Sequence, residues 1–297
     1  MVSVVLLNPR AGRGGARRRH DAVRAVAARQ GIEVRCPASP QEMEHAAREA
    51  ALAGASRVIA AGGDGAVHYV LNGIAGTSAA LGIIPCGSGN DLAVNLGIPD
   101  DIEAAAEIAF HAPVRPFDLC RLEPFGRHFA CIASFGLDSH ANRVANAHTG
   151  PVRGTALYVW SLLHALAKFQ PAEVTVQHDA GTYRDRILLL VAANASSYGG
   201  GMRIAPSANL TDGLLDVVAV GKMTRLKLLW CFPEVFSGRH VRRREVTVLK
   251  TARLSVESSR PLEIFADGEY IGRTPARIEV LPGALRVVAP QLPALVL

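Results

Sequence analysis

The stretch RVIAAGGDGAVHYVLNGI, residues 57–74, decides the fold of the first part of this chain. An apolar segment, Arg57–Ala61, runs directly into the turn GGDG at residues 62–65, and a helix-prone segment, His68–Ile74, follows. A continuous apolar run predicts a strand that is buried on both faces. A glycine-rich turn between such a strand and a helix is typical of parallel α/β sheets, in which these turns lie at the carboxyl edge where ligands bind.

The alternation of strand and helix extends in both directions from this stretch. Val2–Leu7 reads as a strand followed by the turn 8–15, and Leu81–Ile84 reads as a strand followed by the turn 85–91. The sequence therefore predicts an open parallel α/β domain with three glycine-rich turns at one edge. The other predicted elements of this part are a helix ending near Gln30, a strand over Ile32–Arg35, and helices over Pro40–Ala53 and Ile102–Phe110.

Three such turns predict a nucleotide site rather than ordinary connections. Glycines let backbone N–H groups approach phosphate oxygens closely, and the N-terminus of the following helix favours negative charge. Two of the turns carry an aspartate, Asp64 or Asp91, which is the kind of ligand that a metal ion beside a phosphate needs.

Known phosphate-binding motifs do not fit these turns. In GRGGAR, residues 12–17, an arginine stands where the dinucleotide fingerprint has its last glycine, and the Gly-Lys pair at 221–222 is followed by Met223 instead of Ser or Thr. A phosphoryl-transfer site would therefore depend on Arg10, Arg13, backbone amides and magnesium for its positive charge.

The predicted secondary structure changes after residues 113–116, from alternating strands and helices to mainly short strands. Short strand-like segments separated by turn residues run from Phe117 to the end, which is typical of an antiparallel β domain, and one helical segment, Thr155–Phe169, interrupts them. The predicted strands are Phe129–Ser134, Val174–His178, Ile187–Ala193, Leu215–Val220, Glu245–Leu249, Arg253–Glu257, Leu262–Phe265, Arg277–Val280 and Leu285–Val288.

Length and composition indicate a folded protein with two domains. The 297 residues are 49% hydrophobic, which excludes a disordered or fibrous chain, and the net charge of +6 indicates an anionic partner such as nucleotide phosphates, nucleic acid or an acidic membrane surface. A GC-rich genome explains the preference for Arg over Lys equally well. Five scattered cysteines exclude a disulfide framework and indicate reduced thiols. The apolar stretches are shorter than the about 20 residues of a membrane span, so we expect a cytoplasmic protein.

Seven motifs occur in order along the chain, and together they resemble the bacterial diacylglycerol kinase family of soluble lipid kinases. This family is related to eukaryotic diacylglycerol and sphingosine kinases. GGDG alone also occurs in NAD kinases and phosphofructokinases, whereas the ordered series is specific and runs nearly end to end. The motifs are NPxAG (8–12), GGDG (62–65), GSGNDLA (87–93), FGLD (135–138), GGG (199–201), the segment from Pro206 to Asp212-Gly213, and DGE (267–269).

The resemblance implies the fold in more detail. It implies an α/β N-terminal domain over residues 1–116, with a parallel sheet like that of NAD kinase and phosphofructokinase, joined by the tail 286–297. A mainly antiparallel, β-sandwich-like C-terminal domain over residues 117–285 would carry the DGE motif, and ATP would bind in the cleft beside the first domain.

The resemblance also implies the nucleotide and metal ligands. Asp64 and Asp91 would hold a catalytic magnesium ion through water, which suits an ion that dehydrates reluctantly. Ser88 stands where the family has Thr, and Ser39 matches a nucleotide-contacting Thr at loose spacing. The residues assigned to ATP are Asn8, Pro9, Arg10, Ala11, Gly12, Ser39, Gly62, Gly63, Asp64, Gly65, Ala66, Val67, His68, Tyr69, Gly87, Ser88, Gly89 and Asn90.

Two further assignments fall in the second domain. In the DGE motif, Asp267 or Glu269 would be the general base that accepts the proton of a lipid hydroxyl, and a plain Asp-Gly hairpin turn is the alternative. The Asp212 carboxylate, with the backbone carbonyls of Asn209 and Leu214, would hold a second, structural magnesium ion. A simple turn before the next strand is compatible with this assignment.

The chain departs from the family at the start of the helix after GGDG. Ala66 replaces the usual Thr, and His68 and Tyr69 replace the usual Asn and Glu. The loss of a hydrogen bond to a phosphate costs about 1.5–3 kcal/mol, so the nucleotide site could be weaker or use another donor such as His68. Because the aspartates and the DGE motif are intact, we favour an active enzyme.

The resulting hypothesis is an ATP- and magnesium-dependent lipid kinase that converts diacylglycerol to phosphatidate at the inner face of the membrane, where it is peripheral. Sphingoid, ceramide-like and monoacyl substrates stay open, and so does a homodimer. The alternatives are an NAD kinase and a catalytically weak nucleotide- or lipid-binding regulator. No nucleic-acid partner is expected, because no recognised binding module is present.

Two basic clusters have two interpretations. Residues 13–19 and 239–244 are either solvated faces or patches that face an anionic membrane. Trp230, Phe232 and Phe236, near the second cluster, are predicted to belong to the core rather than to anchor the protein to a membrane.

Overall fold

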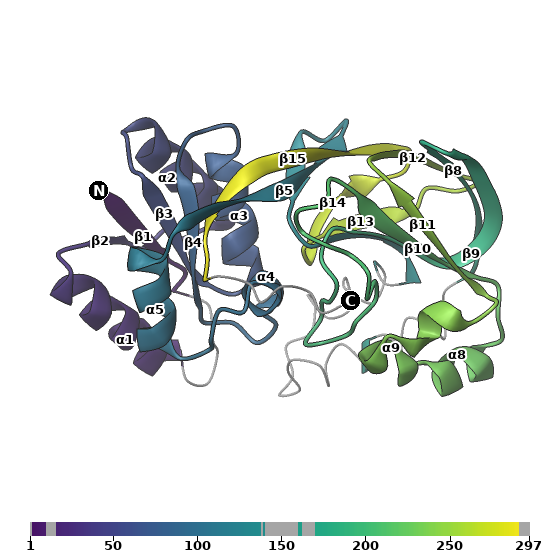
Figure 1. Cartoon of the computed structure of the whole chain (residues 1–297), viewed down its shortest axis with the longest axis horizontal. Coiled ribbons are helices and arrows are strands. Elements are labelled where there is room, and N and C mark those ends of the chain that lie inside the picture. Colours follow the sequence, from purple (N-terminus) through teal and green to yellow (C-terminus); the bar gives the residue numbers. More distant parts are fainter. Residues whose placement is uncertain (1, 10–15, 138, 140–159, 162–169, 291–297) are drawn as a thin grey trace. The chain divides into compact units, whose positions relative to one another are not determined.

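The computed structural model describes residues 2–9, 16–137, 139, 160–161 and 170–290. The chain divides into two compact units, Met1–Phe117 with Gly283–Leu297, and Asp118–Pro282. Two strands contribute residues to both units, β5 (Val114–Glu123) and β15 (Ala276–Val288) (Figure 1). The helix predicted over Thr155–Phe169 lies outside the described residues, apart from two positions.

The first unit is built on a parallel sheet, which confirms the predicted α/β class. Its strand order is β2-β1-β3-β4, and the end of β15 adds beside β4, with Val287 opposite Leu81. Every residue of β3 and β4 is buried, as expected of strands covered on both faces. The bounds are β1 (Ser3–Leu7), β2 (Glu33–Arg35), β3 (Arg57–Gly62) and β4 (Ala80–Pro85).

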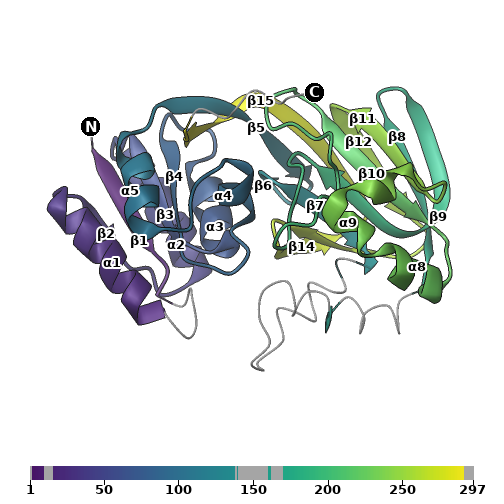
Figure 2. The same cartoon turned by 60° about the horizontal axis from the view of Figure 1, so that its bottom comes forward.

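Helices cover this sheet in two packed pairs (Figures 1 and 2). The helix α2 packs so closely on α3 that a Cβ at Gly73 would lie 2.7 Å from the Ala47 Cβ. On α5, Ala109 packs against Gly82 of β4, and α1 lies against α5. The bounds are α1 (Ala16–Arg29), α2 (Pro40–Leu52), α3 (Asp64–Ile74), α4 (Asp91–Asn95) and α5 (Ile102–His111).

The second unit is antiparallel and β-sandwich-like, as predicted. Its main strand path is β14-β13-β7-β9-β8-β12-β15, and β10 pairs with β9 and β11. The bounds are β6 (Arg127–Phe129), β7 (Ile132–Gly136), β8 (Ala172–His178), β9 (Gly181–Ala193), β10 (Leu215–Gly221), β11 (Val246–Thr251), β12 (Arg253–Ser258), β13 (Glu263–Ala266) and β14 (Glu269–Arg273).

The long strand β9 joins the two layers of the sandwich. Residues 181–187 pair with β8, whereas residues 189–193 pair with β7 and β10. Inward-facing side chains of both layers form one core, which includes Phe135, Val176 and Leu254. A strand that changes partners along its length is a usual way to connect packed sheets.

Some elements differ from the sequence-based expectation. The segment Ala276–Val288 is one strand, although two strands, Arg277–Val280 and Leu285–Val288, were expected, and α3 begins at Asp64, directly after the glycines. Three short helical elements follow β10, namely α8 (Arg225–Cys231), α9 (Glu234–Ser237) and the 3-10 turn η1 (Arg239–Arg242). Among the described residues, no helix is long and apolar enough to cross a membrane.

Candidate active site

The glycine-rich turns after β3 and β4 meet at the carboxyl edge of the sheet, as predicted, and Asn8, which follows β1, lies beside them. A Cβ at Gly62 would lie 3.3 Å from the Asn8 Cβ, and a Cβ at Gly87 would lie 2.5 Å from the Gly63 Cα. The backbones of the turns after β3 and β4 are therefore in direct contact, which only glycine allows. Backbone N–H groups from separate turns are brought within one small region.

The Asp64 carboxylate connects two of these turns. Its Oδ2 accepts a hydrogen bond from the Asn90 backbone N–H at 3.0 Å, and its Oδ1 accepts one from the Asp91 N–H at 2.6 Å. Asn90 has a left-handed backbone, with φ 56°, and its Oδ1 accepts from the Gly87 N–H at 3.0 Å. These contacts fix the shape of the third turn against the start of α3.

The two aspartates could hold a cation between them and a phosphate. A Cβ at Gly89 would lie 2.5 Å from Asp64 Oδ2 and 3.7 Å from Asp91 Oδ1, so both carboxylates flank Gly89. In the part of the chain that the structure describes, no group of three or more His, Cys, Asp or Glu side chains could form a closed metal cage. Two carboxylates suit magnesium, which keeps several waters and binds substrate phosphates.

At the start of α3, two of the three positions that depart from the family are buried, and Tyr69 is half-buried. Ala66 is 3% exposed and His68 is 1% exposed, and the His68 ring contacts Tyr69 edge-on at 5.3 Å between centroids. Because the His68 side chain lies in the interior, its location does not support a role as a replacement phosphate donor. Ala66 fits a position that packs closely against Gly62.

Ser39 has a structural role in this fold. Its Oγ accepts a hydrogen bond from the Glu42 N–H at 3.2 Å, and the Glu42 side chain accepts one from the Ala38 N–H at 2.9 Å, which caps the N-terminus of α2. The assignment of Ser39 to the nucleotide stays a prediction. Arg10, Ala11 and Gly12 lie outside the described residues.

The DGE motif forms a tight hairpin turn between β13 and β14. Ala266 pairs with Glu269, and both residues of the loop have positive φ, 48° at Asp267 and 83° at Gly268. Positive φ at both central residues defines a type I′ turn, for which Asp-Gly is a preferred sequence. The motif is therefore a hairpin turn, and Asp267 and Glu269 do not lie on one face of a strand; the assignment of the general base stays a prediction.

The Asp267 carboxylate is nevertheless more than a turn residue. Its Oδ2 accepts a hydrogen bond from the Ala130 N–H at 2.8 Å, and its Oδ1 accepts from Cys131 and Ile132 at 2.9 and 3.1 Å. Three backbone donors stabilise the charge of this carboxylate and fix its position. Glu269, in contrast, is half-buried at the first position of β14.

Two buried polar residues near this carboxylate were missed by sequence reasoning. Asn194 donates from Nδ2 to the Ala130 carbonyl at 2.8 Å and to the Asp118 carbonyl at 3.1 Å, and Asp118 Oδ2 accepts from the Gly213 N–H at 2.7 Å. They connect the segment that holds Asp267 to the loop after Asp212. A polar residue directly after the apolar run Ile187–Ala193 was the available signal.

The ammonium group of Lys250 lies beside the loop that was predicted to hold a structural magnesium ion. The Lys250 Nζ lies 3.0 Å from Asp216 Oδ1 and 3.4 Å from Asp212 Oδ2, and it donates to the Ser207 carbonyl at 3.3 Å. Asp212 Oδ1 accepts from the Leu214 N–H at 3.1 Å. A divalent ion at Asp212 would therefore meet the positive charge of Lys250, and these residues do not fit a magnesium ion well.

We expect Lys250→Met to destabilise the second unit. Asp216 is 1% exposed, so its charge would lose its nearby cation, and removal of one partner of a buried pair costs several kcal/mol. Since Lys250 is 42% exposed, we expect a smaller loss of about 2 kcal/mol in the free energy of unfolding. Urea unfolding at pH 7 measures it. A loss that magnesium reverses, or no loss, would contradict the role of the ammonium.

The pH dependence of this pair follows from its charges. Partial burial alone would lower the pKa of Lys250, but the hydrogen bond and charge of Asp216, together with Asp212, raise the pKa above its usual value. The stabilisation is therefore complete below the unfolded-state pKa of about 10.4 and is lost only as the pH rises through the folded-state pKa. At pH 7 the pair is intact.

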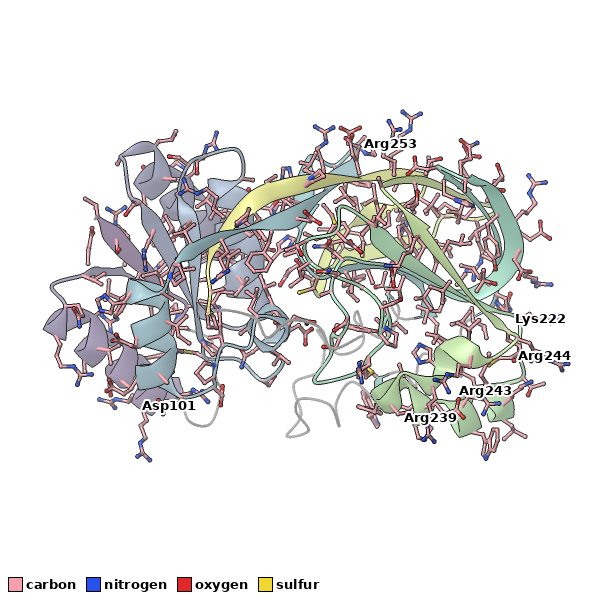
Figure 3. The ribbon with its side chains drawn as sticks, viewed as in Figure 1. Asp101, Lys222, Arg239, Arg243, Arg244 and Arg253 are labelled. Carbon is pink, nitrogen blue, oxygen red and sulfur yellow. The ribbon has the colours of Figure 1, made fainter. Side chains whose placement is uncertain are left out.

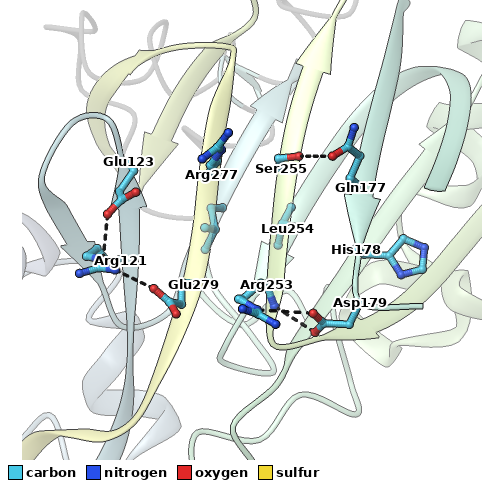
Figure 4. A pocket seen from close by; sticks show the side chains of 11 residues that line it. Arg121, Glu123, Gln177, His178, Asp179, Arg253, Leu254, Ser255, Arg277 and Glu279 are labelled. Carbon is cyan, nitrogen blue, oxygen red and sulfur yellow. Dashed lines mark hydrogen bonds and ion pairs between the residues drawn. The ribbon is translucent and has the colours of Figure 1, made fainter. Parts of the chain in front are cut away.

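A separate hollow of about 410 Å³ lies in the second unit (Figure 4). Its charged side chains largely pair with one another: Arg121 contacts Glu123 and Glu279 at 3.2 and 2.7 Å, and Arg253 contacts Asp179 at 3.6 Å. None of the predicted site residues lines it. Its location does not connect it with the chemistry of the turns or of the DGE motif.

Comparisons with known proteins agree with this architecture. Residues 3–122 match the family model "Diacylglycerol kinase catalytic domain", and residues 131–289 match "YegS C-terminal NAD kinase beta sandwich-like domain". A diacylglycerol kinase of Mycobacterium tuberculosis is 34% identical over 294 residues, covering 96% of this chain and 94% of that protein. A diacylglycerol kinase of Bacillus subtilis is 31% identical and covers 83% and 82% of the two chains.

A solved structure supports the fold. The crystal structure of a diacylglycerol kinase from Bacillus anthracis has a TM-score of 0.74 at 20% identity, and the alignment covers 98% of this chain and 97% of that one. The α/β unit matches the diacylglycerol kinase catalytic domain and the β-sandwich-like unit matches the YegS C-terminal domain, so the two units together define a class of lipid kinases. This chain belongs to the bacterial diacylglycerol kinase family, and it is a lipid kinase.

Proposed function

We propose that this protein transfers the γ-phosphate of ATP to the hydroxyl of diacylglycerol, with magnesium as the metal ion, and produces phosphatidate and ADP. The observation that carries the proposal is the Asp64 carboxylate, which holds two backbone amides of the third glycine turn beside Asp91. Because these two amides donate to Asp64, a phosphate would use other N–H groups of the glycine turns. The arrangement supports the proposal because it places two carboxylates suited to magnesium beside those turns.

The residues of the first unit would bind and orient ATP. Gly63 is the N-cap residue of α3, and no side chain caps this end of the helix. The dipole of α3 therefore favours a phosphate at its N-terminus. The glycine turns allow phosphate oxygens to approach backbone N–H groups. Magnesium, when bound, supplies positive charge that neutralises the transferring phosphate.

The DGE motif would supply the general base. Asp267 or Glu269 accepts the proton of the lipid hydroxyl while that oxygen forms a bond to the γ-phosphorus, and the bond between this phosphorus and the β,γ-bridging oxygen breaks to release ADP. The amide contacts of Asp267 support the proposal because they fix a carboxylate at this hairpin.

Transfer of radiolabelled phosphate from ATP into lipids in mixed micelles tests the proposal. A panel should contain diacylglycerol, monoacylglycerol, sphingosine and ceramide, each with and without magnesium, and the products should be separated by thin-layer chromatography. Label in diacylglycerol that requires magnesium is the expected result. Label in another lipid instead would identify that lipid as the substrate in place of diacylglycerol. Formation of NADP from NAD would favour the NAD kinase alternative. ATP binding without any transfer would favour a regulator.

We expect Asp91→Asn to weaken the dependence on magnesium. The Asp91 backbone N–H still binds Asp64, so the turn keeps its shape, but the side chain loses its charge. The magnesium concentration for half-maximal activity should rise roughly 10–100-fold, by analogy with other residues that act on a metal through an intermediary. Asp64→Asn should show the same rise together with a loss of stability, because its two oxygens accept amide hydrogen bonds. Magnesium titrations identical to those of the wild type would remove both residues from the metal site.

A further inference from the structure

The short helix α8 presents an apolar face to solvent. Leu226 is 80% exposed, Leu229 is 40% exposed and Trp230 is 71% exposed. Their spacing of three and four residues places them on one side of the helix. Phe236, in α9, is 38% exposed, so the expectation that Trp230 and Phe236 belong to the core is wrong. Large apolar side chains grouped on a surface mark an interaction site.

Trp230 contacts a pair of charged side chains, Arg243 and Glu234, through the Arg243 guanidinium. The Arg243 Cζ lies 4.8 Å from the centroid of the Trp230 ring, which is a cation–π contact. Arg243 is in turn fixed by Glu234 through two contacts, Nε to Oε2 at 2.8 Å and Nη2 to Oε1 at 2.5 Å. The exposed indole therefore contacts a guanidinium whose position is fixed by Glu234, and the negative charge of Glu234 is neutralised.

Basic side chains, which we call the basic rim, lie around α8 and α9, and Figure 3 labels Lys222, Arg239, Arg243 and Arg244 among them. Residues 222–244 contain seven Lys or Arg residues and one acidic residue, Glu234. Lys222, Arg239 and Arg242 are exposed, and none of them forms an ion pair with another described residue. Their charges are available to an anionic partner.

We propose that the surface formed by α8, α9 and η1, residues 222–244, docks on an anionic lipid bilayer, with Leu226, Leu229 and Trp230 entering its interface. Interfacial helices combine an apolar face with basic residues, and Trp concentrates at the level of the lipid headgroups. The biological meaning rests on the proposed function, because diacylglycerol would be held in such a bilayer.

Other occupants fit this surface less well. Nucleic acid would use the basic rim but not the leucine side chains. A second copy related by two-fold symmetry would place the same basic rim against itself, and like charges in such an interface repel. An anionic bilayer satisfies both the apolar face and the charge.

Tryptophan fluorescence offers a direct test, because the chain contains only Trp160 and Trp230. In a Trp160→Phe variant, Trp230 is the single reporter. Vesicles of phosphatidylcholine with phosphatidylglycerol should shift its emission to the blue and sediment the protein, and pure phosphatidylcholine should do so much less. An unchanged emission and no sedimentation at high anionic lipid would overturn the proposal.

Matched variants separate the apolar and basic contributions. Leu226→Ala with Leu229→Ala should weaken vesicle binding at least about tenfold, whereas Leu52→Ala, at an isolated position that is 71% exposed in the first unit, should not. Neutralising Lys222, Arg239 and Arg242 with Gln should reduce binding and its salt dependence, whereas Arg253→Gln should not. Wild-type binding by the leucine variant would contradict the proposal.

The competing occupants and the proposed function have their own readouts. A blue shift without vesicles that grows with protein concentration and disappears in the leucine variant would indicate a dimer. Oligonucleotide binding that the leucine variant retains would indicate nucleic acid; either result without vesicle binding overturns the proposal.

Activity on short-chain diacylglycerol dissolved as monomers should persist in all these variants. Vesicle binding without phosphorylation of any lipid would refute the proposed function alone, and phosphorylation of dissolved lipid without vesicle binding would refute the docking surface alone.

Discussion

Replacing the general base of the DGE motif is expected to lower kcat for lipid phosphorylation by about 10²–10⁴-fold, in Asp267→Asn or in Glu269→Gln. Each substitution keeps the size of the side chain but removes the carboxylate that accepts the hydroxyl proton. The affinity for ATP should change little, since neither residue is assigned to the nucleotide. Steady-state phosphorylation kinetics with both variants, alongside ATP titrations, measure the two quantities.

The structure makes the two variants differ in a useful way. Asp267 accepts hydrogen bonds from three backbone amides, so Asp267→Asn turns an amide group toward at least one donor and should also destabilise the fold. Glu269, half-buried at the start of β14, should tolerate Gln without such a loss. Urea unfolding of both variants shows which loss of activity comes from the fold.

The outcomes assign the roles. Loss of kcat in Glu269→Gln alone would identify Glu269 as the base and Asp267 as a positioning residue. Loss in Asp267→Asn under conditions in which it is folded, with full activity in Glu269→Gln, would identify Asp267. Turnover at the wild-type rate in both variants would contradict the assignment of the base to this motif.

Three strands of the first unit were predictable because each is a run of consecutive apolar residues, which indicates a strand buried on both faces. β1, β3 and β4 are apolar runs ending at glycine-rich turns, and chain connectivity alone places such turns at one sheet edge. The joint role of Asp64 was not predictable in the same way. Its contacts with Asn90 and Asp91 depend on a left-handed residue 26 positions away, which no local pattern reports.

The second unit shows where composition is misleading. LKLLWCF, residues 226–232, has the residue types of a core, and the prediction of buried aromatic side chains followed from them. The structure instead exposes Trp230, whose ring contacts the Arg243 guanidinium, which is itself paired with Glu234. The position of Lys250 between Asp212 and Asp216 likewise comes from the pairing of β10 with β11, which places Lys250 opposite Asp216. Hydrophobicity predicts that a segment is buried, but contacts between segments far apart in the sequence decide which of its side chains are buried.

The close approach of two turns gives the second large prediction, that Gly87→Ala will lower kcat/KM for ATP by at least about 10²-fold. A Cβ at position 87 would lie 2.5 Å from the Gly63 Cα and 2.9 Å from Asn90 Oδ1. The first contact is with backbone, so no side-chain rotation relieves it, and the two turns must separate. A displacement of about 1 Å is enough to cause a loss of this size at a catalytic site.

Gly76→Ala is the matched control for this variant. Gly76 has a φ of 74°, so Ala there strains the backbone, but no atom lies within 4 Å of its Cβ. It should cost about 1 kcal/mol in the free energy of unfolding and leave kcat/KM near the wild-type value. Nucleotide binding and steady-state kinetics should be measured for both variants at temperatures where both are folded.

If Gly87→Ala retained wild-type kcat/KM, or if Gly76→Ala lost as much, the contact between the turns would have no special part in binding ATP. Equal stability of the two variants with activity lost only in Gly87→Ala would show that the glycines are required for the spacing of the backbone N–H groups that receive the phosphates.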